Sequence, residues 1–468
     1  MPLNLVPPGT QTIVDVSDDA RYQAALDFLF SRLNYEKAPD AARTISDFKL
    51  SRMERLLEVL GNPHLSIPVV HIAGSKGKGS TATMVARILE DAGYRTGLFT
   101  SPHISRFEER LTINGQLADE ATVIALVDQL RPASAAVERE LGTTPTFFEL
   151  VTAMAWMHFK QAGVQIAVFE VGLGGRLDST NICAPVVTAI TSISRDHTRL
   201  LGETLELIAG EKAGIIKPGV PVVTGVRDPG PLSVIEQKAT AAGSRLTCCD
   251  RDFRGIVSNV HESSASEPFC HSIDFQSEGF SLPGLQLSMA GEHQIRNAAV
   301  AIRIIQELRS AGWEVSEDAI RRGLSRARCL LRIQVVAREP LTILDAAHNP
   351  ASIEALCRTL ASVQTGKRVA IFASSKDKET GKLLAILNEH FDEIWLTRYV
   401  KNPRSVEFET LEELANSILT RPWRIAVTPE AAIADARQQC GKGDLVCVAG
   451  SFFLAAEALD ILQATVQK

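Results

Sequence analysis

Apolar residues follow two different periods along this chain, and the two periods alternate. Short, uninterrupted apolar runs predict buried strands, and in the first half they cover residues 69–73, 97–100, 166–170, 186–194 and 221–224. Between such runs apolar residues recur at helical spacing, as over residues 84–92, where Gly93 follows at the place of a helix C-cap. Strands that alternate with helices indicate a parallel sheet with helices on its faces, so we predict an α/β fold.

The regions that flank these strands have their own patterns. Residues 18–33 and 50–60 each place apolar side chains on one helical face, and we expect packing helices without chemistry there. Residues 243–290 are Ser-rich around 262–267 and then alternate loosely between apolar and polar positions, which we interpret as a β excursion. From residue 293 the helical spacing returns.

The alternation of strands and helices starts again near residue 329. Further strands are predicted at residues 342–344, 368–372, 393–396, 424–427 and 445–448. Asn349 and Pro350 supply an N-cap and a first helical residue after the first of them. Because 468 residues are too many for one ordinary core, we expect a domain over residues 1–328 and a smaller, doubly wound domain over residues 329–468.

Composition excludes several classes of protein. The formal net charge is −6 and the basic residues form no long run, so nucleic acid is not an expected partner. No apolar run reaches the roughly 18 residues of a membrane helix, and the first residues lack the pattern of a secretory signal. The eight cysteines are dispersed without a C-x-x-C pair, which disfavours a zinc site or a disulfide scaffold. We therefore expect a cytoplasmic protein.

A glycine-rich loop lies between the strand at residues 69–73 and the helix that follows it. Gly74, Gly77 and Gly79 are interleaved with Lys78 and Ser80. Glycines let backbone N–H groups close around phosphate oxygens, lysine supplies positive charge, and a serine hydroxyl can hold Mg²⁺. The spacing differs from the common G-x-x-x-x-G-K-[ST], but a merely solvated turn would not need a strand before it and a helix after it. We interpret the segment as a nucleotide phosphate loop, which makes the first domain P-loop-type. The doubly wound second domain is predicted to be Rossmann-like from its own alternation of strands and helices.

Polar residues at other strand ends are candidates for the same site, because ligands of parallel sheets bind outside the carboxyl ends of the strands. Glu170 is either a Mg²⁺ ligand or the cap of a local turn, and His197 is either a ligand or a structural histidine. Lys212, taken alone, reads as a surface lysine. Residues 345–350 either only begin a capped helix or contribute to an ATP site between the two domains.

Taken together, these segments resemble the folylpolyglutamate synthase and dihydrofolate synthase family within the Mur ligase superfamily. The resemblance covers nearly the whole chain in the expected order. Its matching segments are residues 61–63, 71–80, 100–103, 106–110, 147–152, 170–181, 196–197, 210–219, 293–297, 345–350 and 449–451. One such segment would be a weak signal. In order along the chain, and with one segment of twelve residues, Glu-Val-Gly-Leu-Gly-Gly-Arg-Leu-Asp-Ser-Thr-Asn at 170–181, the set is highly specific.

The resemblance implies a role for each matching residue of the nucleotide site. The ATP phosphates would be bound by Gly74, Gly77, Lys78, Gly79 and Ser80. Mg²⁺ would be held by Ser80, Glu170 and His197. Lys212 matches a lysine that CO₂ carbamylates in this family, and the carbamate would turn an ammonium group into a carboxylate that Mg²⁺ accepts.

The resemblance also implies roles for residues of the second domain and for residues that bind the acid substrate. Asn297 would contact adenine, and the second domain would reach the nucleotide through Arg332, Asp345 and His348, with Lys78, Lys212 and His348 as the catalytic set. The loop that embraces the pteridine would use Ser101, Pro102, His103 and Arg106. Two segments depart from the family pattern: Ser75-Lys76 replaces the usual Thr-Asn, and Cys329-Leu-Leu-Arg332 replaces Trp-Pro-Gly-Arg.

The implied activity is ATP-dependent ligation of L-glutamate to dihydropteroate or a reduced folate, through an acyl phosphate, with release of ADP and phosphate. Such an enzyme serves folate biosynthesis and one-carbon metabolism, has only small-molecule partners and is expected to be a monomer. Two alternatives stay open: a Mur-superfamily ligase for a different carboxylic acid, and an ATP-binding regulator that has lost ligation. The sequence does not distinguish dihydropteroate from folate, nor does it set the number of glutamates added.

Overall fold

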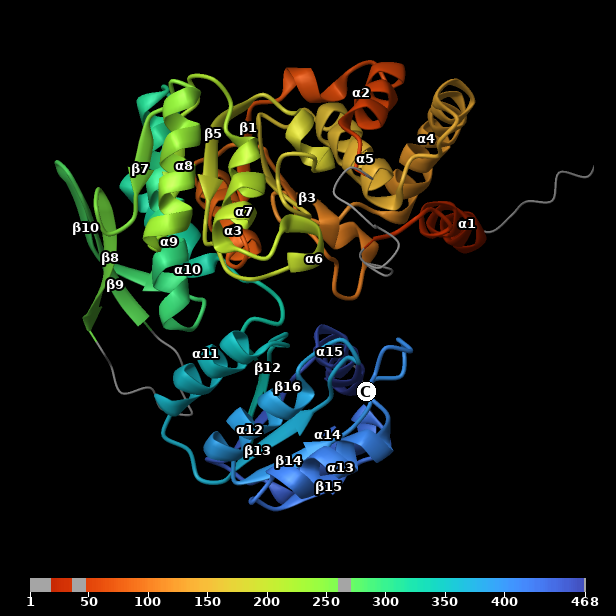
Figure 1. The fold of residues 1–468 in the computed structure, drawn as a ribbon, viewed down its shortest axis with the longest axis vertical. Coiled ribbons are helices and arrows are strands. Elements are labelled where there is room, and N and C mark those ends of the chain that lie inside the picture. The colour runs from red at the N-terminus through yellow and green to blue at the C-terminus, as the bar shows by residue number, and fades with distance from the viewer. Residues whose placement is uncertain (1–17, 36–47, 260–270, 467–468) are drawn as a thin grey trace, which may run out of the picture.

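The computed structural model describes residues 18–35, 48–259 and 271–466 (Figure 1). It has the predicted α/β fold, with a large parallel-sheet unit and a second, smaller sheet unit below it in the view of Figure 1. The Ser-rich stretch at 262–267 lies outside the described residues. Among the described helices, none combines the length and apolar character needed to cross a membrane.

The larger sheet has seven strands in the order β3-β2-β4-β1-β5-β6-β7. Its strands are β1 Val69–Ala73, β2 Thr96–Phe99, β3 Leu111–Ile113, β4 Ile166–Glu170, β5 Pro185–Ile190, β6 Val222–Thr224 and β7 Leu246–Cys248. All neighbours are parallel except β2 and β3. The central strand β1 is buried at every position, which explains why its sequence is an unbroken apolar run around His71.

Helices cover both faces of this sheet because successive side chains of a strand point to opposite faces. Val70 and Ile72 pack with α3 Lys78–Asp91, α9 Glu292–Ser310 and α10 Glu317–Arg326. Val69 faces the opposite cluster, built by α1 Asp18–Phe30, α2 Leu50–Val59, α4 Glu120–Leu141 and α5 Phe147–Gln161. At the end of the sheet, a third cluster contains residues of α6 Thr198–Leu201, α7 Leu205–Lys212 and α8 Pro229–Ala241.

A separate antiparallel sheet occupies the region where a β excursion is expected. Its strands are β8 Phe253–Asn259, β9 His271–Ser277 and β10 Phe280–Leu287, in the order β10-β9-β8. Phe253, Ile273 and Leu285 join the core cluster of α9 and α10, so this sheet packs on the outside of those helices (Figure 1). It takes no part in the site described below.

The C-terminal sheet has six strands in the order β11-β12-β16-β13-β14-β15. They are β11 Gln334–Arg338, β12 Leu341–Leu344, β13 Arg368–Phe372, β14 Glu393–Leu396, β15 Trp423–Ile425 and β16 Leu445–Ala449. One face packs α11 Pro350–Ala361, α12 Thr380–His390 and α13 Phe408–Ile418, and the other packs α14 Pro429–Gln439 and α15 Phe452–Val466. Only β11 is antiparallel to its neighbour, so this unit is doubly wound.

Four short 3₁₀ helices complete the described elements. They are η3 Pro63–Ser66, η4 Phe107–Arg110, η5 Ser179–Ile182 and η6 Ala213–Ile215. The start of α11 follows the predicted chemistry: the Asn349 side chain accepts a hydrogen bond from the backbone N–H of Ser352 at 3.0 Å, and Pro350 is the first helical residue.

Candidate active site

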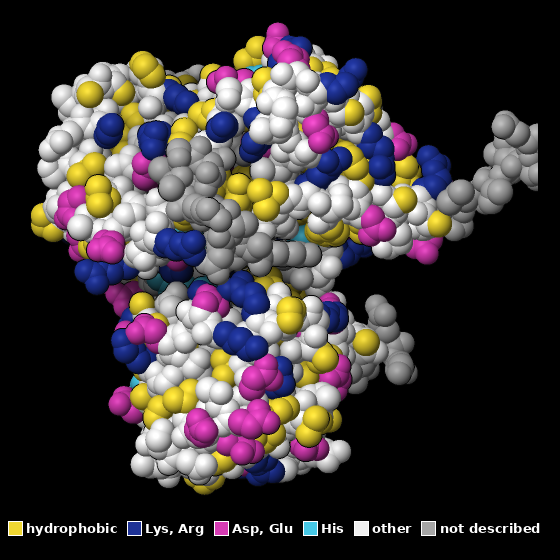
Figure 2. All heavy atoms as spheres, turned by 45° about the vertical axis from the view of Figure 1, so that its right-hand side comes forward, with side chains coloured by type: hydrophobic (Ala, Val, Ile, Leu, Met, Phe, Trp, Pro, Cys, Tyr) yellow, Lys and Arg dark blue, Asp and Glu magenta, His cyan; other side chains and the backbone are white. Residues whose placement is uncertain are grey.

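A cavity of about 1740 Å³ lies between the two sheet units. It is lined by the glycine-rich loop, by the ends of β4 and β5, by the start of α9, and by the segment 345–352 of the C-terminal unit. Figure 2 shows the junction of the two units with dark blue Lys and Arg side chains on both sides of it. This distribution favours an anionic ligand between the units.

The glycine-rich loop is pinned in a conformation that its glycines permit. Gly77 has φ 85° and caps the N-terminus of α3, so the first N–H groups of the helix face the cavity. A Cβ on Gly74 would lie 2.0 Å from Oγ1 of Thr191, which excludes any larger residue. Thr191 Oγ1 also donates to the carbonyl of Lys76 at 2.7 Å, and Lys78 Nζ donates to the carbonyl of Gly74 at 3.1 Å.

Ser80 is held by a residue for which the sequence analysis made no prediction. The amide Nε2 of Gln294 donates to Ser80 Oγ at 3.2 Å, and Asn297 Nδ2 donates to Gln294 Oε1 at 2.9 Å. All three side chains are buried at the first turns of α3 and α9. Asn297 therefore acts on Ser80 through Gln294, and its carbonyl oxygen also lies against Gly77.

Replacing Gln294 by Leu should raise the KM for Mg-ATP about threefold to tenfold, because Ser80 loses the donor that fixes its hydroxyl. The effect should appear in steady-state kinetics at saturating acceptor, with the melting temperature nearly unchanged. Gln129→Leu on the exposed face of α4 is the matched control and should leave KM unaltered. An unchanged KM in Gln294→Leu would show that this contact does not support the loop.

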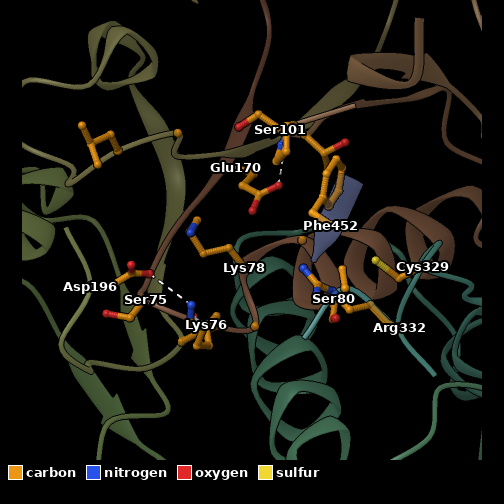
Figure 3. A pocket seen from close by; sticks show the side chains of 18 of the residues that line it. Ser75, Lys76, Lys78, Ser80, Ser101, Glu170, Asp196, Cys329, Arg332 and Phe452 are labelled. Atoms are coloured by element: carbon orange, nitrogen blue, oxygen red, sulfur yellow. Dashed lines mark hydrogen bonds and ion pairs between the residues drawn. The ribbon is translucent and has the colours of Figure 1, made fainter. Parts of the chain in front are cut away.

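Glu170 ends β4 and lies beside the loop. The carboxylate is buried, and its Oε2 accepts a hydrogen bond from the backbone N–H of Ser101 at 3.2 Å (Figure 3). Burial raises the pKa of Glu170, while the charge of Lys78 opposes that rise. A buried carboxylate of this kind is stabilised by a cation in the pocket.

The structure corrects the reading of Lys212 as a surface lysine, which the segment taken alone suggests. Its side chain is buried, and Nζ donates to the carbonyl of Gly74 at 3.0 Å, so it lies directly behind the glycine-rich loop. Burial, and then the nearby charge of Lys78, lower the pKa of Lys212 to about 7. A large share of this amine is therefore neutral, and nucleophilic, near neutral pH.

Lys76 at the tip of the loop is paired within the protein. Its Nζ lies 3.2 Å from Oδ2 of Asp196, which directly precedes His197 in the segment between β5 and α6, so the strand ends at Ile190 and not at residue 194 as predicted. Burial disfavours the ionised form of Asp196, but the charges of Lys76, His197 and Lys78, with the hydrogen bond from Lys76, together lower the pKa of Asp196 to about 2. His197 adopts a left-handed conformation, with φ 50°, and its ring is half exposed to the cavity.

The C-terminal unit contributes Arg332, Asp345 and His348 to the cavity lining. The carboxylate oxygens of Asp345 accept hydrogen bonds from the backbone N–H groups of Ile333 and Ala347, at 2.8 and 2.7 Å. Nδ1 of His348 lies 2.8 Å from the carbonyl of Ala346, so this nitrogen carries the proton and Nε2 is the acceptor. Burial lowers the pKa of His348 to about 4, which keeps the ring neutral.

The predicted substrate loop lies at the same cavity, with one exception. Ser101, Pro102 and His103 line the cavity, whereas Arg106 is exposed outside the lining and pairs with Glu108 at 3.3 Å. The carboxylate of Glu109 accepts the backbone N–H groups of residues 104–106, and so holds the loop in shape.

Most of the predicted site residues are thus brought together. Of the described residues, the cavity lining includes every predicted one except Gly74, Lys212 and Arg106, and the first two lie immediately behind it. Within the same described ranges, no three His, Cys, Asp or Glu side chains gather as a metal cluster.

Comparisons with known proteins give the same picture. The Mur ligase middle domain matches residues 72–305, and the glutamate ligase domain of Mur ligases matches residues 331–452. The chain is 34% identical to the dihydrofolate synthase/folylpolyglutamate synthase of Bacillus subtilis, over 93% of this chain and 98% of that protein.

Solved structures agree with these sequence matches. The folylpolyglutamate synthase of Thermotoga maritima is similar to this chain with a TM-score of 0.83 and 33% identity, and the match covers 96% of this chain and 98% of the Thermotoga chain. Escherichia coli FolC, solved with DHPP and ADP, has a TM-score of 0.80 and 30% identity, with 95% and 98% covered. The chain therefore belongs to the dihydrofolate synthase/folylpolyglutamate synthase family of Mur ligases.

Proposed function

We propose that this protein is an ATP-dependent ligase that joins L-glutamate to dihydropteroate, to a reduced folate, or to both. The observation that carries the proposal is the meeting of three side chains at one glycine-rich loop: Lys78 and Glu170 line the cavity that both units share, and the buried Lys212 lies directly behind the loop. A protein that only binds ATP has no use for a buried lysine of lowered pKa behind its phosphate loop.

The reaction proceeds by activation of the acid. A carboxylate is a poor electrophile, so one of its oxygens first takes the γ-phosphoryl group of ATP, which leaves ADP and an acyl phosphate. The neutral amine of L-glutamate then attacks the acyl carbon, phosphate departs with the original carboxylate oxygen, and the nitrogen releases a proton as the amide forms. Lys78 offers positive charge to the transferring phosphoryl group, and the N-terminal N–H groups of α3 bind the adjacent phosphate groups of ATP.

The residues present fit Mg²⁺. Ser80 and Glu170 supply oxygen ligands and His197 a nitrogen, all three line the cavity, and the buried carboxylate of Glu170 needs a cation for compensation. Bound Mg²⁺ would neutralise charge on the phosphate groups. Gln294 orients the Ser80 hydroxyl, and Ser101 N–H orients the Glu170 carboxylate.

Lys212 fits the carbamate that the family implies. Carbamylation needs a neutral amine: R–NH₂ and CO₂ give R–NH–COO⁻ and a proton. The lowered pKa of Lys212, about 7, makes that amine available, because burial and Lys78 destabilise the ammonium form. The carbamate would exchange a repulsive positive charge for a negative one beside Lys78 and the metal ligands.

The two units have separate tasks in this proposal. Residues 1–328 hold ATP, the metal and the acid, the last through the Ser101–His103 side of the cavity, while residues 329–468 bring Arg332 and His348 onto the nucleotide and accept L-glutamate. Closing the cavity between them excludes water, which would otherwise hydrolyse the acyl phosphate. We infer a cytoplasmic monomer with small-molecule partners only.

Phosphate release with Mg-ATP tests the proposal. We expect release only when L-glutamate and an acceptor are both present, with dihydropteroate, tetrahydrofolate and no acceptor compared in parallel. Release with dihydropteroate alone would define a dihydrofolate synthase, and release with both acceptors a bifunctional enzyme. Folded, ATP-binding protein that releases no phosphate with either acceptor would contradict the folate assignment, and would favour another acid or a regulatory role.

A further inference from the structure

Two residues of the glycine-rich loop depart from the family pattern, and both contact the same segment. Ser75 and Lys76 stand where the family usually has Thr-Asn. They face residues 191–197, which run from the end of β5 to the start of α6 without helix or strand. That segment ends in His197, one of the three residues that the cavity offers to Mg²⁺. The departure from the family pattern therefore bears on the placement of a metal ligand.

Ser75 and the backbone of Lys76 hold the first half of this segment. The N–H of Ser75 donates to the carbonyl of Ser192 at 2.8 Å. The Ser75 hydroxyl donates to the carbonyl of Ser194 and accepts from its N–H, each at 3.0 Å. The Ser192 hydroxyl accepts from the N–H of Lys76 at 3.0 Å and donates to its carbonyl at 2.9 Å. These bonds end at Ser194, three residues before the metal ligand.

The side chain of Lys76 carries the contact further along the segment. Its Nζ donates to Oδ2 of Asp196 at 3.2 Å, and Figure 3 shows the two side chains turned toward each other. Asp196 directly precedes His197, and its Oδ1 lies 3.8 Å from Nε2 of His197. On the other side, the carbonyl of His197 accepts the backbone N–H groups of Leu200 and Leu201, at 2.9 and 3.0 Å. The ion pair and α6 thus anchor the metal ligand from its two sides.

His197 needs such anchors because of its backbone and its exposure. Its φ of 50° lies in the left-handed region, which residues with a Cβ adopt uncommonly and keep where contacts hold them. Its side chain is 50% exposed, so packing alone does not fix the ring. An asparagine in place of Lys76, as in the family pattern, has no charge to pair with Asp196. The anchor on the N-terminal side therefore belongs to this chain.

We propose that Lys76 is a positioning residue of the metal site, which holds His197 in place through Asp196. Residues behind a metal ligand fix the orientation of that ligand, and their loss typically weakens metal binding about 10- to 100-fold. The ion pair is the link of this kind that the glycine-rich loop supplies. The inference rests on the proposed function for the presence of Mg²⁺ and ATP in the cavity.

Mn²⁺ bound with AMPPCP, an ATP analogue that cannot transfer its γ-phosphoryl group, reports on the metal site without turnover. The main variant combines Lys76→Met with Asp196→Asn, because it removes the ion pair and leaves the net charge beside the metal unchanged. Calorimetry would give the Kd for Mn-AMPPCP and the Kd for AMPPCP in EDTA. Pulsed electron paramagnetic resonance would show whether a histidine nitrogen is bound to Mn²⁺, with His197→Ala as the reference that lacks it.

The expected loss is confined to the metal complex. The double variant should weaken Mn-AMPPCP binding about tenfold and reduce the nitrogen signal of the wild type, while the Kd for AMPPCP in EDTA stays unchanged. Lys76→Arg, which keeps the charge and a donor, should bind as wild type does.

Three results would overturn the proposal. An equal loss of affinity in EDTA would mean that Lys76 acts on the nucleotide and not on the metal ligand. A full nitrogen signal in the double variant would mean that His197 keeps its place without the ion pair. A wild type without any nitrogen signal would mean that His197 is no ligand. Absent ligase activity would contradict the proposed function and leave these readouts intact.

A second lysine–carboxylate pair offers the matched control. Nζ of Lys442 lies 3.0 Å from Oε1 of Glu339 in the C-terminal unit, and neither residue lines the cavity. Lys442→Met combined with Glu339→Gln should leave both Kd values and the nitrogen signal unchanged. A weakened Kd for Mn-AMPPCP in this control would mean that the loss of any such pair lowers the affinity, and would overturn the positioning role.

Discussion

Lys78→Met is expected to lower kcat for glutamate ligation by at least about 10³-fold, because the transferring phosphoryl group loses a cation that no neighbour replaces. Lys78 follows the capping Gly77, is tied to the carbonyl of Gly74, and faces the same pocket as Glu170 (Figure 3). Lys76 cannot substitute, since its ammonium is engaged by Asp196. Steady-state phosphate release at saturating substrates measures the loss.

Two further variants sharpen that result. Lys78→Arg keeps the charge but not the compact ammonium group and should retain an intermediate activity. Lys442→Met, which removes a highly exposed lysine of the C-terminal unit, should behave as wild type. If Lys78→Met kept more than a tenth of the wild-type kcat, the loop lysine would have no part in phosphoryl transfer.

The second large effect is expected at Lys212, where replacement by Met should reduce kcat by about 10² to 10³-fold, because the variant lacks both the proposed carbamate and the hydrogen bond to the carbonyl of Gly74. Wild-type activity should fall in CO₂-depleted buffer and recover on addition of bicarbonate, whereas the variant should not respond. With the pKa of Lys212 near 7, protonation removes the reactive amine as pH drops, so the bicarbonate response should weaken below about pH 7.

Thermal melting in CO₂-free buffer shows whether that variant is folded. Burial disfavours the ammonium form of Lys212, so protonation of this side chain destabilises the folded protein in full below about pH 7. The free energy of unfolding of the wild type therefore rises as pH increases from about 7 toward the ordinary lysine pKa. Lys212→Met should therefore melt above wild type at pH 6, with the gap shrinking toward pH 10. Lys238→Met, at an exposed position of α8, is the control. A variant that melts lower at pH 6, or a wild type that ignores bicarbonate, would contradict the role of Lys212.

Elements with strong local patterns could be predicted from the sequence almost to the residue. The strands at 69–73 and 166–170 coincide with β1 and β4, because each is an apolar run buried on both faces. The short strand β3 Leu111–Ile113 was not predicted, since three residues at an antiparallel edge leave no periodic signal. The phosphate loop is predictable because glycines alternate with Lys78 and Ser80 between a strand and a helix, and Gly77 takes the left-handed conformation that favours glycine.

Contacts between residues that are far apart in the chain could not be predicted from the sequence. Lys212 is the last residue of α7, and its hydrogen-bond partner Gly74 is far away in sequence, so nothing local marks it as buried. Gln294 has no local mark that separates it from a solvent-exposed glutamine, and its partner Ser80 is on another helix. The missing Pro-Gly before Arg332 proved informative only in the structure, where Leu331 takes a left-handed conformation without glycine.

Isotope transfer from the acid tests the central chemistry most directly. Dihydropteroate with both carboxylate oxygens labelled with ¹⁸O would be turned over with Mg-ATP and L-glutamate, and the phosphate released would be analysed by mass spectrometry. An acyl phosphate requires that one carboxylate oxygen leaves with phosphorus, so each phosphate should carry one ¹⁸O. Product formation with unlabelled phosphate would show that the acid is never phosphorylated, and would contradict the mechanism.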